Sequence, residues 1–481
     1  MTRQLVINTR FVSMALFILS YVVLNAAPLR ILHTNDSHAA YEPGRNGLGG
    51  YLALEYHLNQ ARGEAEASLY LDAGDMQTGS IFSSMEYKGI KGAAILEVFD
   101  MLNLDAATLG NHEFDVSYNH AKALVDKASF PFLSANIFER DGSSFGRREY
   151  EIFERGELRI GVIGLTIESL PLRVKAENVA NLDILPYKDA LERILTEVDQ
   201  KSDLIVLLSH DGFDADSLLA TQLDHRVDMI IGGHSHIAIS EPYQVNGIYI
   251  LSTGSHLQAL GIADLEVEND QIVSFASQLL PLTAAPVDYY SELGDFLKLN
   301  IGDLETRLAK LAGTLPYDFE VDKFRVTPGS QWIADALLAQ YPSAEISFIN
   351  NGGLRKHLPA GEVSLRDLHE YIPFGNTVAF FECSGEDILR ALAINRQNAI
   401  DKPYDIMSSS IEGWAEAPLE ISLIRVNGQN LELNRTYRVV SHDYIISQWD
   451  KYLGFVPKNA WDSGDLFLDA IINQVELQLS D

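Results

Sequence analysis

Histidine, aspartate and asparagine gather in five short clusters, and each cluster stands where an apolar run ends. Their side chains offer nitrogen and oxygen donors together, the combination that suits a pair of borderline divalent metals. A hydrophobic chain has no packing reason to place so many hydrophilic side chains after predicted strands. The clusters therefore indicate an active site that holds metal. They are residues 35–38, 74–75, 110–115, 209–211 and 232–236.

The spacing within these clusters indicates how the donors converge. Asp36 and His38 lie two residues apart, so both point to one side if the backbone is extended. Asp75 follows a glycine that lets the backbone approach a cation, and its carboxylate could bridge two metals. A single Gly-Asp or Ser-His-Asp is usually a turn or a cap, but five clusters in this order favour ligation. The expected ligands are Asp36, His38, Asp75, Asn111, His210, His234 and His236.

Alternating strands and helices are predicted to position the clusters. The pattern extends from about residue 29 to 280 and predicts an α/β layered architecture with catalytic groups at the carboxyl ends of strands. A helical segment follows near 289–312, and a second α+β unit begins beyond residue 313. Strands are expected at 29–34, 67–73, 106–109, 158–166, 204–209, 229–232, 248–253, 346–350 and 377–382. Helices are expected at 50–62, 91–102, 186–200, 329–340, 364–371 and 385–394.

Length and charge narrow the classes of function. A chain of 481 residues is too long for one ordinary core, so at least two domains are expected. The net charge of −31 argues against nucleic acid as a partner, because phosphate backbones are bound by clustered lysine and arginine. An anionic small-molecule substrate must therefore be attracted locally, by metals or by a few arginines. The sequence gives no indication of the oligomeric state.

The N-terminus predicts export. Arg3 and Arg10 precede an uncharged stretch at 11–24, and small residues follow, which is the pattern of a signal peptide over residues 1–27. The protein is thus expected to be periplasmic or secreted. The apolar stretch is short for a membrane span of about 20 residues, although an uncleaved N-terminal anchor is an alternative. Cys383, the only cysteine, excludes an intramolecular disulfide and is expected to be a buried thiol.

The motifs resemble a known family. Asp36-x-His38, Gly74-Asp75, the run 110–113 and Gly233-His234-Ser235-His236 resemble the calcineurin-type metallophosphoesterases. With its C-terminal half, the chain resembles the 5′-nucleotidase family. The resemblance implies a four-layer metallophosphoesterase β-sandwich flanked by helices at 28–285, a connecting helix at 286–312 and an α+β substrate-binding domain at 313–481.

The resemblance also implies roles for the clustered residues. His112 and Asp115 resemble the catalytic dyad of the family, in which the imidazole stabilises charge on the phosphoryl group and the leaving oxygen. The nucleophile would be metal-bound hydroxide, without a covalent intermediate. The metals are expected to be zinc, with manganese or cobalt as alternatives. One metal would be held by Asp36, His38, Asp75 and His236, and the other by Asp75, Asn111, His210 and His234.

The second domain supplies the expected substrate pocket. Taken alone, the run 350–355 would be a glycine turn with a surface arginine, but it resembles the Asn-Gly-Gly-x-Arg motif of the nucleotidases, which suits a phosphate or carboxylate. Phe374 and Tyr444 would stack on the two faces of a base, and Asp450 would accept ribose hydroxyls. Gln448 and Trp449 replace two glycines of the family and do not easily allow the close backbone approach that glycine permits, so the base and ribose side of the pocket departs from the family pattern. The expected substrate-binding residues are Arg325, Asn351, Gly353, Arg355, Phe374, Tyr444 and Asp450.

These features predict hydrolysis of nucleoside 5′-monophosphates, or related nucleotides, to nucleoside and phosphate. The alternatives with the same metal chemistry are a 2′,3′-cyclic nucleotide, a nucleotide sugar or a sulfur ester. An alternative of another class is a nucleotide-binding surface protein without catalysis. The presence of every expected ligand and of the His112–Asp115 pair disfavours that alternative.

Overall fold

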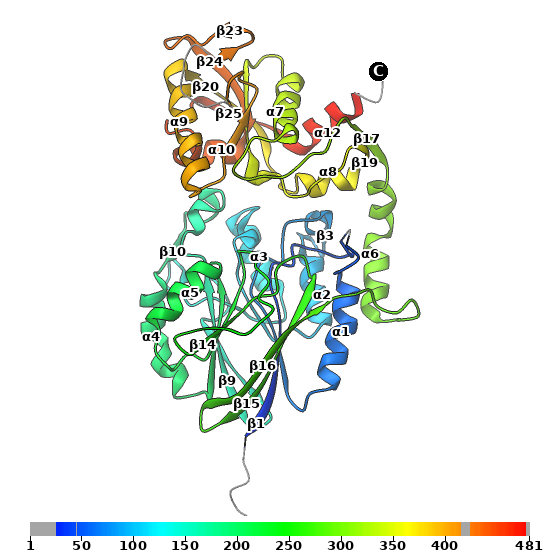
Figure 1. Cartoon of the computed structure of the whole chain (residues 1–481), viewed down its shortest axis with the longest axis vertical. Helices are drawn as coiled ribbons and strands as arrows, with labels where there is room; N and C mark the ends of the chain where they lie inside the picture. The colour runs from blue at the N-terminus through cyan, green and yellow to red at the C-terminus, as the bar shows by residue number, and fades with distance from the viewer. Residues whose placement is uncertain (1–25, 45, 415–423, 478–481) are drawn as a thin grey trace, which may run out of the picture.

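The computed structural model describes residues 26–44, 46–414 and 424–477 (Figure 1). The signal peptide expected at 1–27 lies outside the described residues, apart from its last two. Within the described ranges, none of the helices has both the length and the apolar character that a membrane crossing needs.

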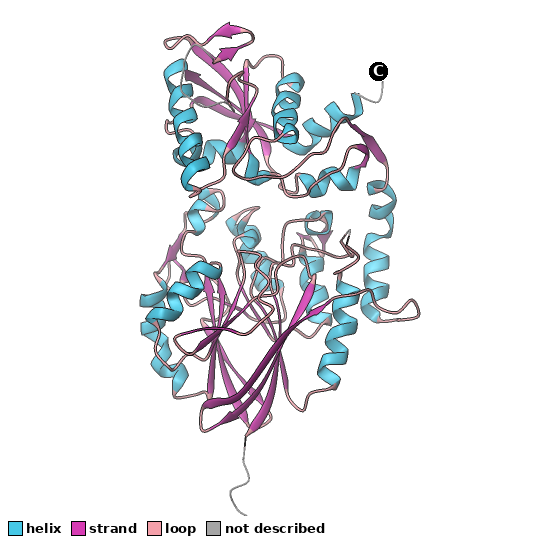
Figure 2. Ribbon diagram, in the orientation of Figure 1, coloured by secondary structure: helices cyan, strands magenta, loops and turns pink. Residues whose placement is uncertain are grey.

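Two six-stranded sheets form the N-terminal part of the chain (Figure 2). The first has the order β16 (Gln271–Pro281), β15 (Ala259–Glu268), β1 (Ala27–Thr34), β2 (Ser68–Asp72), β5 (Ala106–Thr108), β6 (Phe132–Leu133). The second has the order β13 (Tyr243–Val245), β14 (Ile248–Leu251), β12 (Met229–Gly232), β11 (Leu204–His210), β9 (Leu158–Thr166), β8 (Tyr150–Arg155).

Alternation along the strands places one apolar core between the sheets and another on each outer face. Ile31 and Leu71 of the first sheet pack with Val206 and Ile231 of the second. The outer face of the first sheet is covered by α1 (Tyr51–Gly63), α2 (Ala93–Met101) and α3 (Tyr118–Lys127), and that of the second by α4 (Tyr187–Asp199) and α5 (Phe213–Gln222). The predicted layered sandwich is confirmed.

The C-terminal part contains a five-stranded sheet with the order β21 (Met407–Ser409), β18 (Ile346–Asn350), β24 (Thr436–His442), β20 (Thr377–Ser384), β25 (Lys458–Leu466). One face packs on α7 (Pro328–Gln340), α8 (Leu365–Tyr371) and α12 (Phe467–Leu477), and the other on α9 (Gly385–Asp401), α10 (Asp443–Ser447) and α11 (Trp449–Tyr452). Capping boxes at Thr327, Ser364 and Ser384 begin α7, α8 and α9.

The remaining elements are short, apart from α6 (Glu292–Leu308), which runs alongside α1 toward the C-terminal part in Figure 1. Small two-stranded sheets pair β3 (Glu86–Tyr87) with β4 (Ile90–Lys91), β7 (Ile137–Glu139) with β10 (Leu182–Ile184), β17 (Leu311–Leu315) with β19 (Gly361–Ser364), and β22 (Arg425–Val426) with β23 (Gln429–Asn430).

Parallel pairing brings the polar clusters to one edge. In the first sheet β1 pairs in parallel with β2, and β2 with β5, while in the second sheet β11 pairs in parallel with β12. Each of these strands is followed by one of the five clusters. The loops after all five strands therefore leave the sandwich at the end that faces the C-terminal part (Figure 1).

Candidate active site

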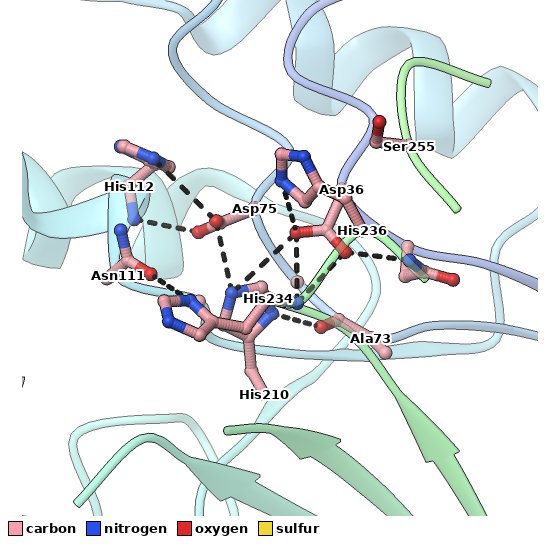
Figure 3. Close-up of polar contacts among 12 residues, drawn as sticks. Asp36, Ala73, Asp75, Asn111, His112, His210, His234, His236 and Ser255 are labelled. Atoms are coloured by element: carbon pink, nitrogen blue, oxygen red, sulfur yellow. Dashed lines mark hydrogen bonds and ion pairs between the residues drawn. The ribbon is translucent and has the colours of Figure 1, made fainter. Parts of the chain in front are cut away.

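Two groups of donors face one another at this edge (Figure 3). Within each group the potential ligand atoms all lie within 4.8 Å of one another. A further set of the same kind links His38, Asp75 and His112 across the two groups. The groups are Asp36, His38 and His236, and Asp75, His210 and His234.

Left-handed backbone positions the donors. The φ angles of Asp36, His38, Asp75, His234 and His236 are 49°, 48°, 57°, 70° and 56°. The backbone of the Asp36-x-His38 motif is therefore not extended, and tight turns bring these side chains together instead. A left-handed conformation costs a non-glycine residue on the order of 1–3 kcal/mol of free energy, so the surrounding loops must impose it.

In the first group, hydrogen bonds fix how the imidazoles are presented. Nδ1 of His38 donates to the carbonyl oxygen of Thr78 at 2.9 Å, which leaves Nε2 to present its lone pair to the site. That Nε2 lies 3.0 Å from Nε2 of His236, and the latter lies 3.4 Å from Oδ1 of Asp36. Burial, with the neighbouring His256 and His236, holds the pKa of His38 well below its usual value. His38 is thus neutral and able to ligate.

In the second group, one nitrogen atom lacks a partner. Nδ1 of His210 donates to the carbonyl oxygen of Ala73 at 2.6 Å. Its Nε2 is buried 3.0 Å from Oδ2 of Asp75 yet makes no aligned hydrogen bond. Burial alone lowers the pKa of His210, but the Asp75 and Asp36 carboxylates and the Ala73 carbonyl together outweigh burial and raise it to about 10. The carboxylates therefore demand a positive charge here, and the donor set fits a divalent cation.

The loops that carry the donors are braced by Glu113. Its carboxylate accepts backbone N–H bonds from Gly110 at 2.7 Å, Met76 at 2.9 Å, and Asp75 and Gln77 at 3.2 Å each. Burial and the nearby Asp75 raise the pKa of Glu113 to about 7. Glu113 thus ties the loop after β2 to the loop after β5 and contributes no ligand of its own.

His112 and Asp115 form a close pair beside the donors. Nδ1 of His112 lies 2.7 Å from Oδ2 of Asp115, and the hydroxyl of Thr78 donates to the same oxygen at 2.6 Å. Burial opposes charge on the His112 ring, but Asp115 and Asp75 raise its pKa above the usual value. Thr78 supports both His38 and Asp115, and no motif in the sequence distinguishes it from an ordinary loop threonine.

A cavity of about 530 Å³ extends from these residues to the C-terminal part. The structure brings four of the expected substrate residues to its wall, namely Gly353, Arg355, Phe374 and Tyr444. The Phe374 ring lies 5.7 Å from the His112 ring and 5.7 Å from the Arg355 guanidinium. Residues from the two halves of the chain therefore meet at the His112–Asp115 pair.

The other three expected substrate residues do not line the cavity. The Arg325 side chain is 67% exposed and forms ion pairs with Glu320 and Asp322. The amide of Asn351 is buried and donates to the carbonyl oxygen of Arg325 at 2.9 Å. Asp450 is exposed. Local ion pairs and hydrogen bonds thus hold Arg325 and Asn351 away from the cavity wall.

Gln448 and Trp449, which replace two family glycines, do not obstruct the cavity. Trp449 is 37% exposed and lies outside the cavity lining, while Gln448 is buried. The positions that the structure adds to the wall include Arg173, Lys323, Tyr404 and Asp405. Their approach depends on contacts distant in sequence, and no local motif singles them out.

Each half of the chain matches the model of a known protein family. Residues 29–238 match the family model of the calcineurin-like phosphoesterases, and residues 307–456 match that of the 5′-nucleotidase C-terminal domain. The chain belongs to the 5′-nucleotidase family. It is accordingly an enzyme, a phosphoric ester hydrolase. Its activity is metal-dependent, since calcineurin-like phosphoesterases use a divalent metal pair.

Relatives extend over most of the chain. It is 26% identical to a 5′-nucleotidase of Vibrio cholerae, over 88% of this chain and 85% of the relative. The crystal structure of a 5′-nucleotidase precursor from Thermus thermophilus superposes with a TM-score of 0.81 at 22% identity, covering 94% of this chain and 96% of the other. The sulfate thiohydrolase SoxB of Thermus thermophilus superposes with a TM-score of 0.75 at 18% identity, covering 93% and 94%. The fold of this family member thus leaves the substrate to be argued from its own residues.

Proposed function

We propose that this enzyme hydrolyses the 5′-phosphate ester of nucleotides, releasing nucleoside and phosphate. The observation that carries the proposal is the meeting of the two donor groups with Arg355 and Phe374 at one cavity. Two aromatic side chains on the cavity wall, Phe374 and Tyr444, suit a nucleobase. Hydrolysis of nucleotides is also the activity named for relatives that match most of the chain.

The donor groups are proposed to hold two metals, zinc being the best match to imidazole and carboxylate together. When bound, such a pair polarises the phosphoryl group and supplies a nucleophile from water. Asp75 would be shared between the two metals, because its carboxylate lies within 4.8 Å of donor atoms of His38 in one group and of His210 and His234 in the other. The first metal is assigned to Asp36, His38, Asp75 and His236, and the second to Asp75, Asn111, His210 and His234.

The chain's own side chains then orient the ester. Nδ1 of His112 donates to Asp115, so its Nε2 edge is held toward the cavity and stabilises negative charge on the phosphoryl oxygens. Arg355 makes no ion pair with any described carboxylate, and its guanidinium is therefore free to bind the phosphate. Phe374, beside both groups, limits the access of water.

We also propose how the chain is divided into domains. Residues 28–285 would form the metal-binding domain, 286–312 the connecting helix and 313–481 the substrate-binding domain. A signal peptide at 1–27 would direct the enzyme to the periplasm or the medium. Export would place it where nucleotides can be degraded for uptake of the nucleoside.

Phosphate release from a panel of esters tests the proposal. Adenosine 5′-monophosphate should be hydrolysed with divalent metal present, faster than 2′,3′-cyclic adenosine monophosphate, a nucleotide sugar, p-nitrophenyl phosphate or a sulfur ester. Preference for any of the other esters would replace the proposed substrate, and binding without turnover would indicate a non-catalytic protein.

A variant pair separates the role of His112 from metal binding. His112→Ala should lose about 10²–10⁴-fold in kcat while metal content stays unchanged. His225→Ala is the matched control, because His225 is exposed and outside the cavity. Hydrolysis at the wild-type rate by His112→Ala would contradict the assignment.

A further inference from the structure

The wall of the cavity carries positive charge that the protein does not neutralise. Arg173, Lys323 and Arg355 all line it, although the whole chain has a net charge of −31. None of the three forms an ion pair with a carboxylate among the described residues, whereas Lys175 beside them is paired with Asp443. Unpaired cations that face one cavity in an acidic protein indicate that their counter-ion is a ligand.

These cations converge from both halves of the chain. Arg173 follows the short 3₁₀ turn Leu170–Leu172 of the N-terminal part, and its charge acts on His234 of the donor groups. Lys323 precedes α7 in the C-terminal part. Loss of water inside the cavity, together with the charges of Arg355 and Arg173, lowers the pKa of Lys323 to about 8. The three charges therefore repel one another, and an anion between them would relieve the repulsion.

The one carboxylate on this part of the wall is already engaged. Asp405 accepts hydrogen bonds from the hydroxyl of Tyr452 at 2.8 Å, the backbone N–H of Gly352 at 2.8 Å and the amide of Asn350 at 3.0 Å. It also lies 3.3 Å from Nζ of Lys451. Asp405 thus anchors the 350–355 loop, and its charge offsets that of Lys323 only in part, without an ion pair to Lys323 or Arg173.

A single phosphate bound by Arg355 would leave Arg173 and Lys323 without an anionic partner. Under the proposed function, the phosphate that is cleaved lies at the donor groups, within reach of Arg355. Arg173 and Lys323 are then two further cations on the wall of the same cavity, which also receives the leaving alcohol. Asp450, the residue expected to accept ribose hydroxyls, is exposed outside the cavity lining. The cavity thus offers the leaving group cations in place of a free carboxylate.

We propose that Arg173 and Lys323 form a second anion subsite, which binds a phosphate group carried by the nucleoside itself. This inference rests on the proposed function and names its preferred substrate class, the nucleoside bisphosphates. Water hydrolyses the 5′-ester, the P–O bond to the nucleoside breaks, and the second phosphate leaves with the nucleoside. The subsite thereby distinguishes this enzyme from one that recognises ribose hydroxyls through a carboxylate.

The test compares adenosine 5′-monophosphate with adenosine 3′,5′-bisphosphate on the full chain with its metals. The wild type should show at least a tenfold higher kcat/KM for the bisphosphate, with adenosine 3′-monophosphate as the chromatographic product. Lys323→Met and Arg173→Gln should each lower kcat/KM for the bisphosphate at least tenfold and change that for the monophosphate less than threefold. Lys188→Met is the matched control, since Lys188 is 74% exposed on α4.

The outcomes separate the two proposals. Equal kcat/KM for both nucleotides in the wild type, or equal losses for both in the variants, would overturn the subsite and leave the proposed function standing. If no nucleotide is hydrolysed, the proposed function fails, and calorimetric affinity for the two nucleotides decides the subsite. At least tenfold tighter binding of the bisphosphate, lost in Lys323→Met, would support it, and equal affinity would overturn it.

Discussion

The side-chain amide of Gln448 donates a hydrogen bond of 2.8 Å to the carbonyl oxygen of Val174, joining the two halves of the chain beside the cavity. The same amide lies 3.3 Å from the carbonyl oxygen of Pro171. Lys175 and Asp443 form an ion pair beside this contact. A glutamine that replaces a family glycine therefore ties the two parts of the enzyme together without lining the cavity.

Gln448→Leu should weaken this tie. The buried carbonyl of Val174 loses its partner, so the free energy of unfolding should fall by about 1–3 kcal/mol. The halves should also separate more readily, which solution scattering would register as a larger radius of gyration. Gln429→Leu, at an exposed hairpin position, is the control and should change neither quantity. An unchanged radius and unfolding free energy in Gln448→Leu would show that the contact does not hold the halves.

The buried ion pair of Asp405 and Lys451 should contribute to the stability of the fold. Asp405→Asn leaves Lys451, which is 7% exposed, without its carboxylate, so stability should fall by about 3–5 kcal/mol. Adding Lys451→Met should recover part of that loss, because the unpaired charge is removed. Urea denaturation of both variants measures the effect, with exposed Asp450→Asn as the control. Equal losses in the single and double variants would contradict coupling of the pair.

The metal donors could be predicted because their motifs are local. Each follows a parallel strand, and parallel strands end together, so the clusters that hold Asp36, Asp75 and His210 reach the same edge of the sandwich. The left-handed backbone at Asp36 and Asp75 could not be predicted, since neither residue type requires it. The β15–β16 hairpin was also missed, although Asn269 and Asp270, both at positive φ, carried a turn signal.

The substrate wall was harder to predict for a physical reason. Lys323 and Arg325 lie two residues apart, and the loop conformation alone decides which one faces the cavity. Asp405 reaches the 350–355 loop through contacts with Tyr452 and Asn350 that are distant in sequence. Motif spacing contains neither kind of information, so four of the seven expected residues line the cavity and three do not.

The single thiol should be inert in the folded protein. Cys383 is 1% exposed, as expected for a structural thiol, and burial raises its pKa to about 12. Reaction with an aromatic disulfide reagent at pH 8 should therefore be slow in the native state and complete within minutes in denaturant. Fast labelling of the native protein would contradict burial of this strand.

His33 should contribute to loss of stability in acid. Its ring is buried, its Nδ1 has no hydrogen-bond partner, and burial lowers its pKa to about 3. Because the unfolded chain takes up this proton near its ordinary pKa of about 6.5, stability is full above that pH and falls as the pH drops toward 3. His33 alone should make the free energy of unfolding fall by up to about 1.4 kcal/mol per pH unit in this range.

Denaturation of His33→Gln between pH 7 and 4 checks this sign. The variant should lose stability less steeply than the wild type as the pH falls. His225→Gln, at an exposed position, should retain the wild-type slope. A parallel pH dependence in His33→Gln and the wild type would exclude His33 as the source.

Metal stoichiometry tests the central claim most directly. Elemental analysis of the purified enzyme should find two divalent ions per chain, and Asp75→Asn should retain none, because its carboxylate is shared between the two sites. Asp214→Asn, at an exposed position on α5, should keep both ions. A wild type with fewer than two ions, or an Asp75→Asn variant that keeps both, would contradict a pair of metals bridged by Asp75.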